Sequence, residues 1–225
     1  KEIEERLLEE TDYKLELRQS IEFSNSCNAI EGVIFPVYYP KLSSDKIITM
    51  DWMNGMHLSE FSKQNTSQEL ADKVGQALWD FYMFQIHGLK MVHADPHPGN
   101  FMVDSENNLI AIDFGCIKQI PDDFYTPYFS LTDRNNLDNS DYFHGRLLEL
   151  EILQEKDTDK ERKFFSEMFY EMFAMFSTPY QSEVFDFIDK EFLITPEARE
   201  LNSIREKLMN NFGILKNGRA AIIKN

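Results

Sequence analysis

Three residues in two short segments have the types that phosphoryl transfer requires. Residues 92–100 contain Asp95 and Asn100, and residues 112–115 contain Asp113. In phosphoryl transfer the protein mainly positions the reactants and neutralises charge, because oxygen ligands hold Mg²⁺ and one carboxylate orients the attacking hydroxyl. Two carboxylates and one amide oxygen are suitable groups for these roles.

The order of the two segments is more specific than either segment alone. The first reads H-x-D-x-x-x-x-N, and the second reads D-F-G after two short apolar runs with a turn between them. A single D-F-G or H-x-D would be weak support. Both motifs in this order are typical of the catalytic lobe of a protein-kinase-like fold.

A metal site is the alternative interpretation of the first segment. His93, Asp95 and His97 offer three ligand side chains within five residues. Pro96 and Pro98 exclude a regular helix there, so the two histidines do not share a helix face. The kinase-like interpretation is therefore favoured.

Local turn chemistry predicts how this loop is arranged. We expect His93 to be a buried strut that holds the loop by hydrogen bonds. Pro98-Gly99 is a turn pair that would bring Asn100 back toward Asp95. The sequence indicates no particular role for His97.

Composition indicates a globular chain and excludes some partners. The 225 residues are 42% hydrophobic and include 19 phenylalanines, which excludes general disorder. A net charge of −16 argues against a nucleic-acid partner. Two cysteines favour a reducing compartment, so we expect a cytoplasmic protein. No apolar run reaches the length of a membrane span, although peripheral association with a membrane is compatible with the sequence.

Hydrophobic periodicity and turn residues predict the order of elements. We expect an early helix, two strands, a longer helix, the catalytic loop, a hairpin and further helices. The corresponding ranges are 1–29, 32–38, 46–53, 66–88, 93–100, 101–112 and 122 onward, with the last long helix at 195–213. A capping box of Thr66 and Glu69 is expected to begin the helix at 66–88.

Four motifs in this order resemble the UbiB-like (ADCK-type) atypical kinases. Glu10-Thr11-Asp12-Tyr13 followed by Glu16 is similar to the E-x-D-Y-x-x-E signature of that family. Residues 48–55 are similar to its L-T-M-E-x-x-x-G hinge, residues 93–100 to its H-x-D-x-H-P-G-N loop, and 113–115 to its D-F-G. The resemblance covers residues 8–120, and beyond them only the helical character matches.

The resemblance implies an α+β, protein-kinase-like fold. It would contain a mainly helical C-lobe together with the C-helix and a short β-hairpin of the N-lobe. Residues 1–54 would form the partial N-lobe, ending at the hinge, and residues 55–225 the helical C-lobe.

The resemblance also implies residue roles. Asp95 would be the catalytic aspartate, supported by His93, and Asn100 and Asp113 would bind Mg²⁺. Glu16 would pair with a lysine that contacts the ATP phosphates, the E-x-D pair would meet an N-terminal extension, and the hinge would face adenine. The implied cofactor-binding residues are Glu10, Asp12, Glu16, Met50, Asp51, Trp52 and Met53. A solvated helix face is the alternative for the three acidic residues.

One departure from the family pattern affects activity. The family carries a K-x-G-Q motif, an alanine-rich nucleotide loop and a phosphate-binding lysine before the E-x-D helix, and these 225 residues contain none of them. We therefore expect the chain to be a fragment that is inactive by itself.

The resulting expectation is a Mg²⁺-dependent ATP enzyme, acting on a small or lipid-like acceptor or as an ATPase, as implied by a family linked to ubiquinone and isoprenoid lipids. The alternatives are an aminoglycoside- or choline-type phosphotransferase and a slow nucleotide-binding scaffold in a lipid-synthesis complex. A dense Phe/Met stripe at 164–176 is either a core helix face or a lipid groove. The side chains of Trp52 and Trp79 are expected to pack against other residues.

Overall fold

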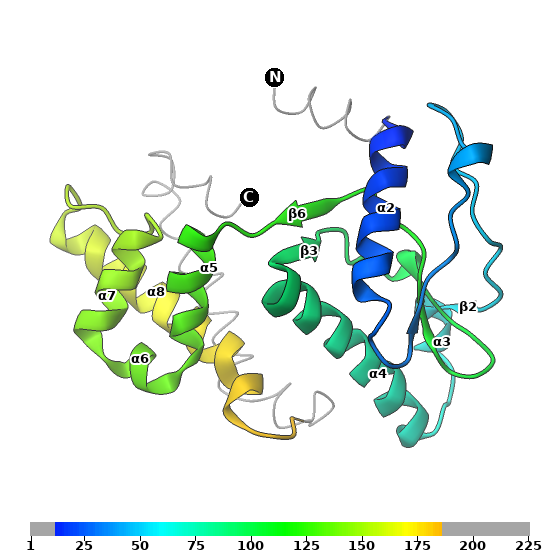
Figure 1. Ribbon diagram of the computed structural model, residues 1–225. Coiled ribbons are helices and arrows are strands. Elements are labelled where there is room, and N and C mark those ends of the chain that lie inside the picture. The colour runs from blue at the N-terminus through cyan, green and yellow to red at the C-terminus, as the bar shows by residue number, and fades with distance from the viewer. Residues whose placement is uncertain (1–11, 186–225) are drawn as a thin grey trace. The chain divides into compact units, whose positions relative to one another are not determined.

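The computed structural model describes residues 12–185 of a chain that divides into two compact units, residues 1–120 and 121–225 (Figure 1). The predicted lobe boundary between residues 54 and 55 lies within the first unit and stays a prediction. Glu10 and the helix predicted at 195–213 lie outside the described residues.

The first unit combines helices with short strands. Its elements are α2 (Tyr13–Cys27), β1 (Val33–Ile34), η1 (Pro40–Leu42), β2 (Met56–His57), α3 (Leu58–Phe61), α4 (Gln68–Met83), η2 (Phe84–Leu89), β3 (Met91–His93), η3 (Pro98–Asn100), β4 (Phe101–Val103), β5 (Leu109–Ala111) and β6 (Ile117–Gln119).

Two small sheets organise this unit. Strands β1, β5, β4 and β2 form one sheet in that order, with β1 parallel to β5 and the other neighbours antiparallel. Strands β3 and β6 form a separate antiparallel pair in which His93 lies opposite Ile117. The chain segments before and after the β4–β5 hairpin are thereby paired with each other.

Local sequence explains where α2 begins and which face it buries. The Asp12 carboxylate accepts a hydrogen bond from the main-chain N–H of Leu15 at 3.0 Å, so Asp12 caps the helix. Leu17, Phe23 and Cys27 lie on the buried face, at helical spacing.

The start and end of α4 differ from the prediction. Ser67, rather than Thr66, caps the helix by accepting from the N–H of Leu70 at 3.3 Å. After Met83 the chain continues as a π-helical segment, η2, and Lys90 leaves it in a left-handed conformation with φ of 51°. The π-helical segment changes the direction in which the last side chains before β3 point.

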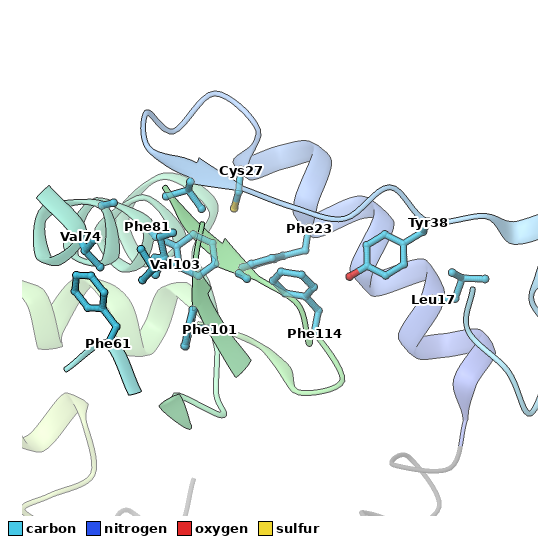
Figure 2. Close-up of a cluster of buried hydrophobic side chains, with 14 residues drawn as sticks. Leu17, Phe23, Cys27, Tyr38, Phe61, Val74, Phe81, Phe101, Val103 and Phe114 are labelled. Atoms are coloured by element: carbon cyan, nitrogen blue, oxygen red, sulfur yellow. The ribbon is translucent and has the colours of Figure 1, made fainter. Parts of the chain in front are cut away.

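Aromatic side chains pack together between α2, α4 and the D-F-G segment (Figure 2). The Phe23 ring lies 5.3 Å from the Phe114 ring and 6.1 Å from the Phe81 ring, between centroids. Phe114 is fully buried and belongs to D-F-G, so its neighbours Asp113 and Gly115 are held close to α2. Burying a phenylalanine contributes roughly 1.5–3 kcal/mol to stability.

The hairpin predicted at 32–53 is less regular than expected. Only Val33–Ile34 forms a strand, and Tyr38 and Met50 form an isolated bridge. The N–H of Tyr39 donates to the Thr49 carbonyl at 2.8 Å, so the two arms still run side by side. Proline at 36 removes one ladder donor, and an isolated pair of strands has little cross-strand support.

The described part of the second unit is helical. Its elements are α5 (Asp122–Phe129), η4 (Ser130–Thr132), α6 (Arg134–Asp138), α7 (Ser140–Glu149), α8 (Asp159–Ser177) and η5 (Thr178–Gln181). Four residues of the Phe/Met stripe, Phe165, Met168, Phe169 and Phe173, lie in the hydrophobic core of this unit, which favours the core interpretation over a lipid groove. Within residues 12–185, no helix is both long and apolar enough to cross a membrane.

Candidate active site

The loop between β3 and β4 is shaped by a short turn at its end. His97 caps η3, because its Nδ1 atom accepts a hydrogen bond from the N–H of Gly99 at 3.0 Å. The N–H of Asn100 donates to the His97 carbonyl at 2.9 Å. His97, which had no predicted role, therefore shapes the turn that places Asn100.

This turn brings Asn100 to Asp95. The Asn100 Nδ2 atom donates to Asp95 Oδ2 at 3.0 Å and to the Asp95 carbonyl at 3.2 Å. Both side chains are accessible to solvent rather than buried. The structure thus contains the local geometry predicted from the Pro98-Gly99 turn.

The hairpin places Asp113 beside the same loop. The N–H of Ile112 donates to the Asn100 carbonyl at 3.1 Å, so the end of β5 lies next to the start of β4. Asp113 follows directly, and its Oδ1 atom accepts from the N–H of Gly115 at 2.9 Å. The three residues singled out for phosphoryl transfer are gathered at one end of the hairpin.

His93 is buried beneath this site, with 2% of its surface exposed. Its ring packs edge-on against Phe101 and Phe114, at centroid distances of 6.0 and 5.7 Å. Neither ring nitrogen has a hydrogen-bond partner, whereas the main-chain N–H donates to Gln85 Oε1 at 2.7 Å. The buried position agrees with the prediction, but ring packing and the main chain, rather than ring hydrogen bonds, hold His93.

Burial also determines the charge of this imidazole. Loss of solvent lowers the pKa of His93, while the Asp113 and Asp95 carboxylates oppose that shift, and the main chain of Asp113 acts in the same direction as they do without reaching hydrogen-bond geometry. Both carboxylates therefore act electrostatically on one buried ring, whose lowered pKa disfavours its charged form.

Glu16 approaches Asp113 from α2. A Cβ atom added at Gly115 would lie 3.4 Å from Asp113 Oδ1 and 3.6 Å from the Glu16 carboxyl carbon. Burial, and secondarily the Asp113 charge, raise the pKa of Glu16. Within the described residues no lysine or arginine forms an ion pair with Glu16. Glu16 is half-buried at the site and is not part of a solvated helix face.

The E-x-D pair is described only in part. Asp12 is exposed and caps α2, which is a structural role in its own right. Glu10 lies outside the described residues. A contact with an N-terminal extension stays a prediction for both residues.

The predicted hinge residues lie in the second arm of the irregular hairpin. The N–H of Asp51 donates to the Val37 carbonyl at 2.9 Å, and its carboxylate accepts from the Tyr39 hydroxyl at 2.7 Å. The main-chain N–H of Asp51 is therefore already engaged and does not contact a base. Trp52 is 88% exposed, so its interpretation as a packing residue was wrong.

The remaining hinge residues are accessible for contact with a base. Met50 has 40% of its surface exposed, and Met53 is half-buried. Binding of adenine by residues 50–53 stays a prediction.

The oxygen atoms at the site fit Mg²⁺. Since Asn100 uses its nitrogen toward Asp95, its Oδ1 atom stays available, and Asp113 has a second carboxylate oxygen beyond the one that accepts from Gly115. Mg²⁺ is commonly held by one or two such groups together with substrate phosphates. Among residues 12–185 no group of three or more His, Cys, Asp or Glu side chains could hold a metal, so the His93–Asp95–His97 alternative has no support.

Gln85 contacts this loop, although the sequence did not predict that contact. Gln85 falls on the apolar face of the helical pattern, where a polar residue is unexpected, and this position could have indicated a specific role. The structure buries it completely and joins it to His93.

A known protein family matches the whole first unit and the start of the second. Residues 1–140 match the ABC1 atypical kinase-like domain, which confirms the resemblance to UbiB-like kinases. The chain is 30% identical to AarF domain-containing protein kinase 1 of Xenopus laevis, over 54% of this chain and 24% of that protein. It is 27% identical to protein ACTIVITY OF BC1 COMPLEX KINASE 7 of Arabidopsis thaliana, over 54% of this chain and 19% of that protein.

The chain thus spans less than a quarter of the length of these relatives. The Arabidopsis protein is described as chloroplastic, so a cytoplasmic location is not supported by the relatives.

A solved structure shows the same fold. The complex of Rv3197 with erythromycin from Mycobacterium tuberculosis aligns with a TM-score of 0.64 and 22% identity, over 92% of this chain and 56% of that one. Together with the domain match, this confirms an α+β, kinase-like architecture.

Proposed function

The chain belongs to the ABC1 atypical kinase-like domain family, and on that premise we propose that its site uses Mg²⁺-ATP for phosphoryl transfer. The acceptor would be water or a small or lipid-like molecule, including an isoprenoid. An aminoglycoside- or choline-type phosphotransferase is disfavoured by the family to which residues 1–140 belong.

The observation that carries this proposal is the hydrogen bond from Asn100 Nδ2 to Asp95 Oδ2. It leaves the Asn100 oxygen free for a cation and fixes the Asp95 carboxylate beside it. The pairing of β4 with β5 adds the Asp113 carboxylate at the same end. A metal ligand set and a carboxylate that can accept a proton are the groups that phosphoryl transfer needs from a protein.

Each residue would have a distinct role in the reaction. Asp113 and Asn100 would hold Mg²⁺, which would neutralise phosphate charge, and Asp95 would orient the acceptor hydroxyl or water. His93, which is buried and packs against Phe101 and Phe114, would support the loop that carries Asp95. When the nucleotide site is complete, Glu16 would pair with a lysine that contacts the ATP phosphates.

ATP turnover by the full-length protein tests this proposal. We expect Mg²⁺-dependent release or transfer of phosphate that Asp95→Asn abolishes, with a lipid extract and water compared as acceptors. Binding of Mg²⁺-ATP without any Asp95-dependent turnover would favour the nucleotide-binding scaffold. Absence of both binding and turnover would contradict the proposal.

A further inference from the structure

Gln85 occupies an unusual position beneath the catalytic loop. It is the second residue of the π-helical segment that follows α4, and none of its surface is exposed. π-Helical turns are rare and occur preferentially at functional sites, because the wider turn redirects side chains. Here the wider turn lies between α4 and β3, the strand that leads into the catalytic loop.

The Gln85 side chain holds the end of that strand. Its Oε1 atom accepts the main-chain N–H of His93 at 2.7 Å, in a buried contact. The next N–H, of Ala94, donates to the Cys116 carbonyl at 2.8 Å. Two consecutive main-chain groups are thus fixed to two different elements, and Asp95 is the next residue.

The far side of Asp95 is fixed as well. The Asn100 side chain donates to its carboxylate, and the Asn100 main chain is held by His97 and Ile112. Asp95 therefore lies between two anchors, and Gln85 provides a side-chain contact of the first one. A shift of His93 would pass directly to the carboxylate two residues later.

Packing alone does not explain a glutamine here. Its Nε2 atom is buried without a hydrogen-bond partner, and an unsatisfied buried amide group destabilises a core. Methionine would fill a similar volume without that penalty. The contribution that methionine cannot supply is the oxygen that accepts from His93.

We infer that Gln85 is a positioning residue for Asp95, acting through the main chain of His93. This inference rests on the proposed function, because it concerns the same phosphoryl-transfer site. Gln85 lies in η2, outside the kinase-like motifs, and would help to determine the position of Asp95.

Three variants of the full-length protein test the inference. Gln85→Met removes the acceptor oxygen, and Gln85→Glu keeps one at similar reach. Gln76→Met makes the same change on an exposed position of α4, where the amide contacts only Asp80. Turnover number, Mg²⁺-ATP dissociation constant and melting temperature are measured for each.

We expect Gln85→Met to lower the turnover number by about 10- to 100-fold, as misplacement of a reacting group does. The dissociation constant of this variant for Mg²⁺-ATP should stay unchanged. The lost contact is the one to the His93 main chain, and the proposed metal ligands Asn100 and Asp113 do not depend on it directly. Gln85→Glu keeps the acceptor oxygen but buries a carboxyl group, so it should recover part of the turnover at a lower melting temperature. Gln76→Met should resemble the wild type. Wild-type turnover in Gln85→Met would overturn the inference, as would parallel losses of binding, turnover and melting temperature without rescue by Gln85→Glu.

Amide hydrogen exchange separates this inference from the proposed function. If the wild type shows no turnover, the proposed function fails, and exchange of segment 93–100 is compared between wild type and Gln85→Met. Faster exchange confined to that segment would support positioning of the loop by Gln85. Unchanged exchange would overturn it.

Discussion

The side-chain nitrogen of Asn100 donates a hydrogen bond of 3.0 Å to the Asp95 carboxylate, across a turn that His97 caps. This bond gives each residue an orientation that it would not have alone. Asp95 keeps one carboxylate oxygen outside this hydrogen bond, and the side-chain oxygen of Asn100 takes no part in it. This arrangement suits the different roles proposed for the two residues.

Asp113→Asn is expected to abolish measurable binding of Mg²⁺-ATP by the full-length protein. The change removes the charge of a carboxylate that would hold the metal. Asp95→Asn should leave binding intact and impair turnover, since it removes only the group that orients the acceptor. Isothermal titration calorimetry on both variants, with and without Mg²⁺, makes the comparison. Unchanged binding in Asp113→Asn would exclude it as the metal ligand.

His97→Ala should loosen the turn before Asn100. It removes the acceptor for the N–H of Gly99, a bond of the kind that contributes about 1 kcal/mol to stability. His97→Asn is the matched control, because asparagine can also accept from the main chain two residues later. Urea unfolding and turnover should show a loss for the alanine variant only. Wild-type stability and turnover in His97→Ala would mean that the cap is unimportant.

Gly55 and Gly75 should respond in opposite directions to alanine. A Cβ atom at Gly55 would lie 2.8 Å from the main-chain oxygen of Val103, so β4 must move to admit it. Gly75 is on α4 with no atom within 4 Å of the added Cβ, and alanine there should stabilise the helix by about 0.5–1 kcal/mol. Chemical denaturation of both variants measures the difference. A stable Gly55→Ala protein would contradict the close approach.

The contribution of His93 to stability should fall as pH decreases from about 7 toward 5. Burial lowers the pKa of His93 in the folded protein, whereas in the unfolded chain it titrates near 6.5. The unfolded state therefore binds the proton first, and stability present above that pH is lost below it. His93→Leu should reduce this slope. His87, whose pKa burial also lowers, retains part of it. Urea unfolding at several pH values measures the slope for the wild type and for His93→Leu. Identical slopes would show that His93 does not contribute to the pH dependence.

The sequence predicted the geometry of the loop between β3 and β4 well because the relevant contacts are local. Asp95 and Asn100 belong to one loop, and proline and glycine at 98–99 specify the turn between them. Asp113 is reached through a hairpin whose apolar strands are readable from the sequence. These contacts depend little on distant parts of the chain.

Other features depended on tertiary context. Gln85 was missed because its partner is a main-chain N–H and because a 3.6-residue pattern does not reveal a π-helical segment. Trp52 was expected to pack, since a large aromatic residue is usually buried, but its arm of the hairpin is exposed. The strand predicted at 46–53 has the right composition and lacks the neighbouring strands that would regularise it.

The last prediction concerns the acceptor and rests on the segment after D-F-G. In protein kinases a long activation segment, which ends in A-P-E, follows this motif and carries the phosphorylation site. Here β6 begins at Ile117 and pairs with β3, and α5 begins at Asp122. The chain contains no A-P-E, and no Ser, Thr or Tyr lies between Gly115 and Pro121.

This segment leaves no loop to form a platform for a peptide, since its main chain is already paired in the β3–β6 ribbon. We therefore expect the full-length protein not to phosphorylate other proteins. Incubation with labelled ATP and generic protein substrates tests this, with Asp95→Asn as the control for contaminating kinases and with release of free phosphate followed in parallel. Labelling of those substrates that disappears in Asp95→Asn would show that a peptide can reach Asp95, and the acceptor would then be a protein.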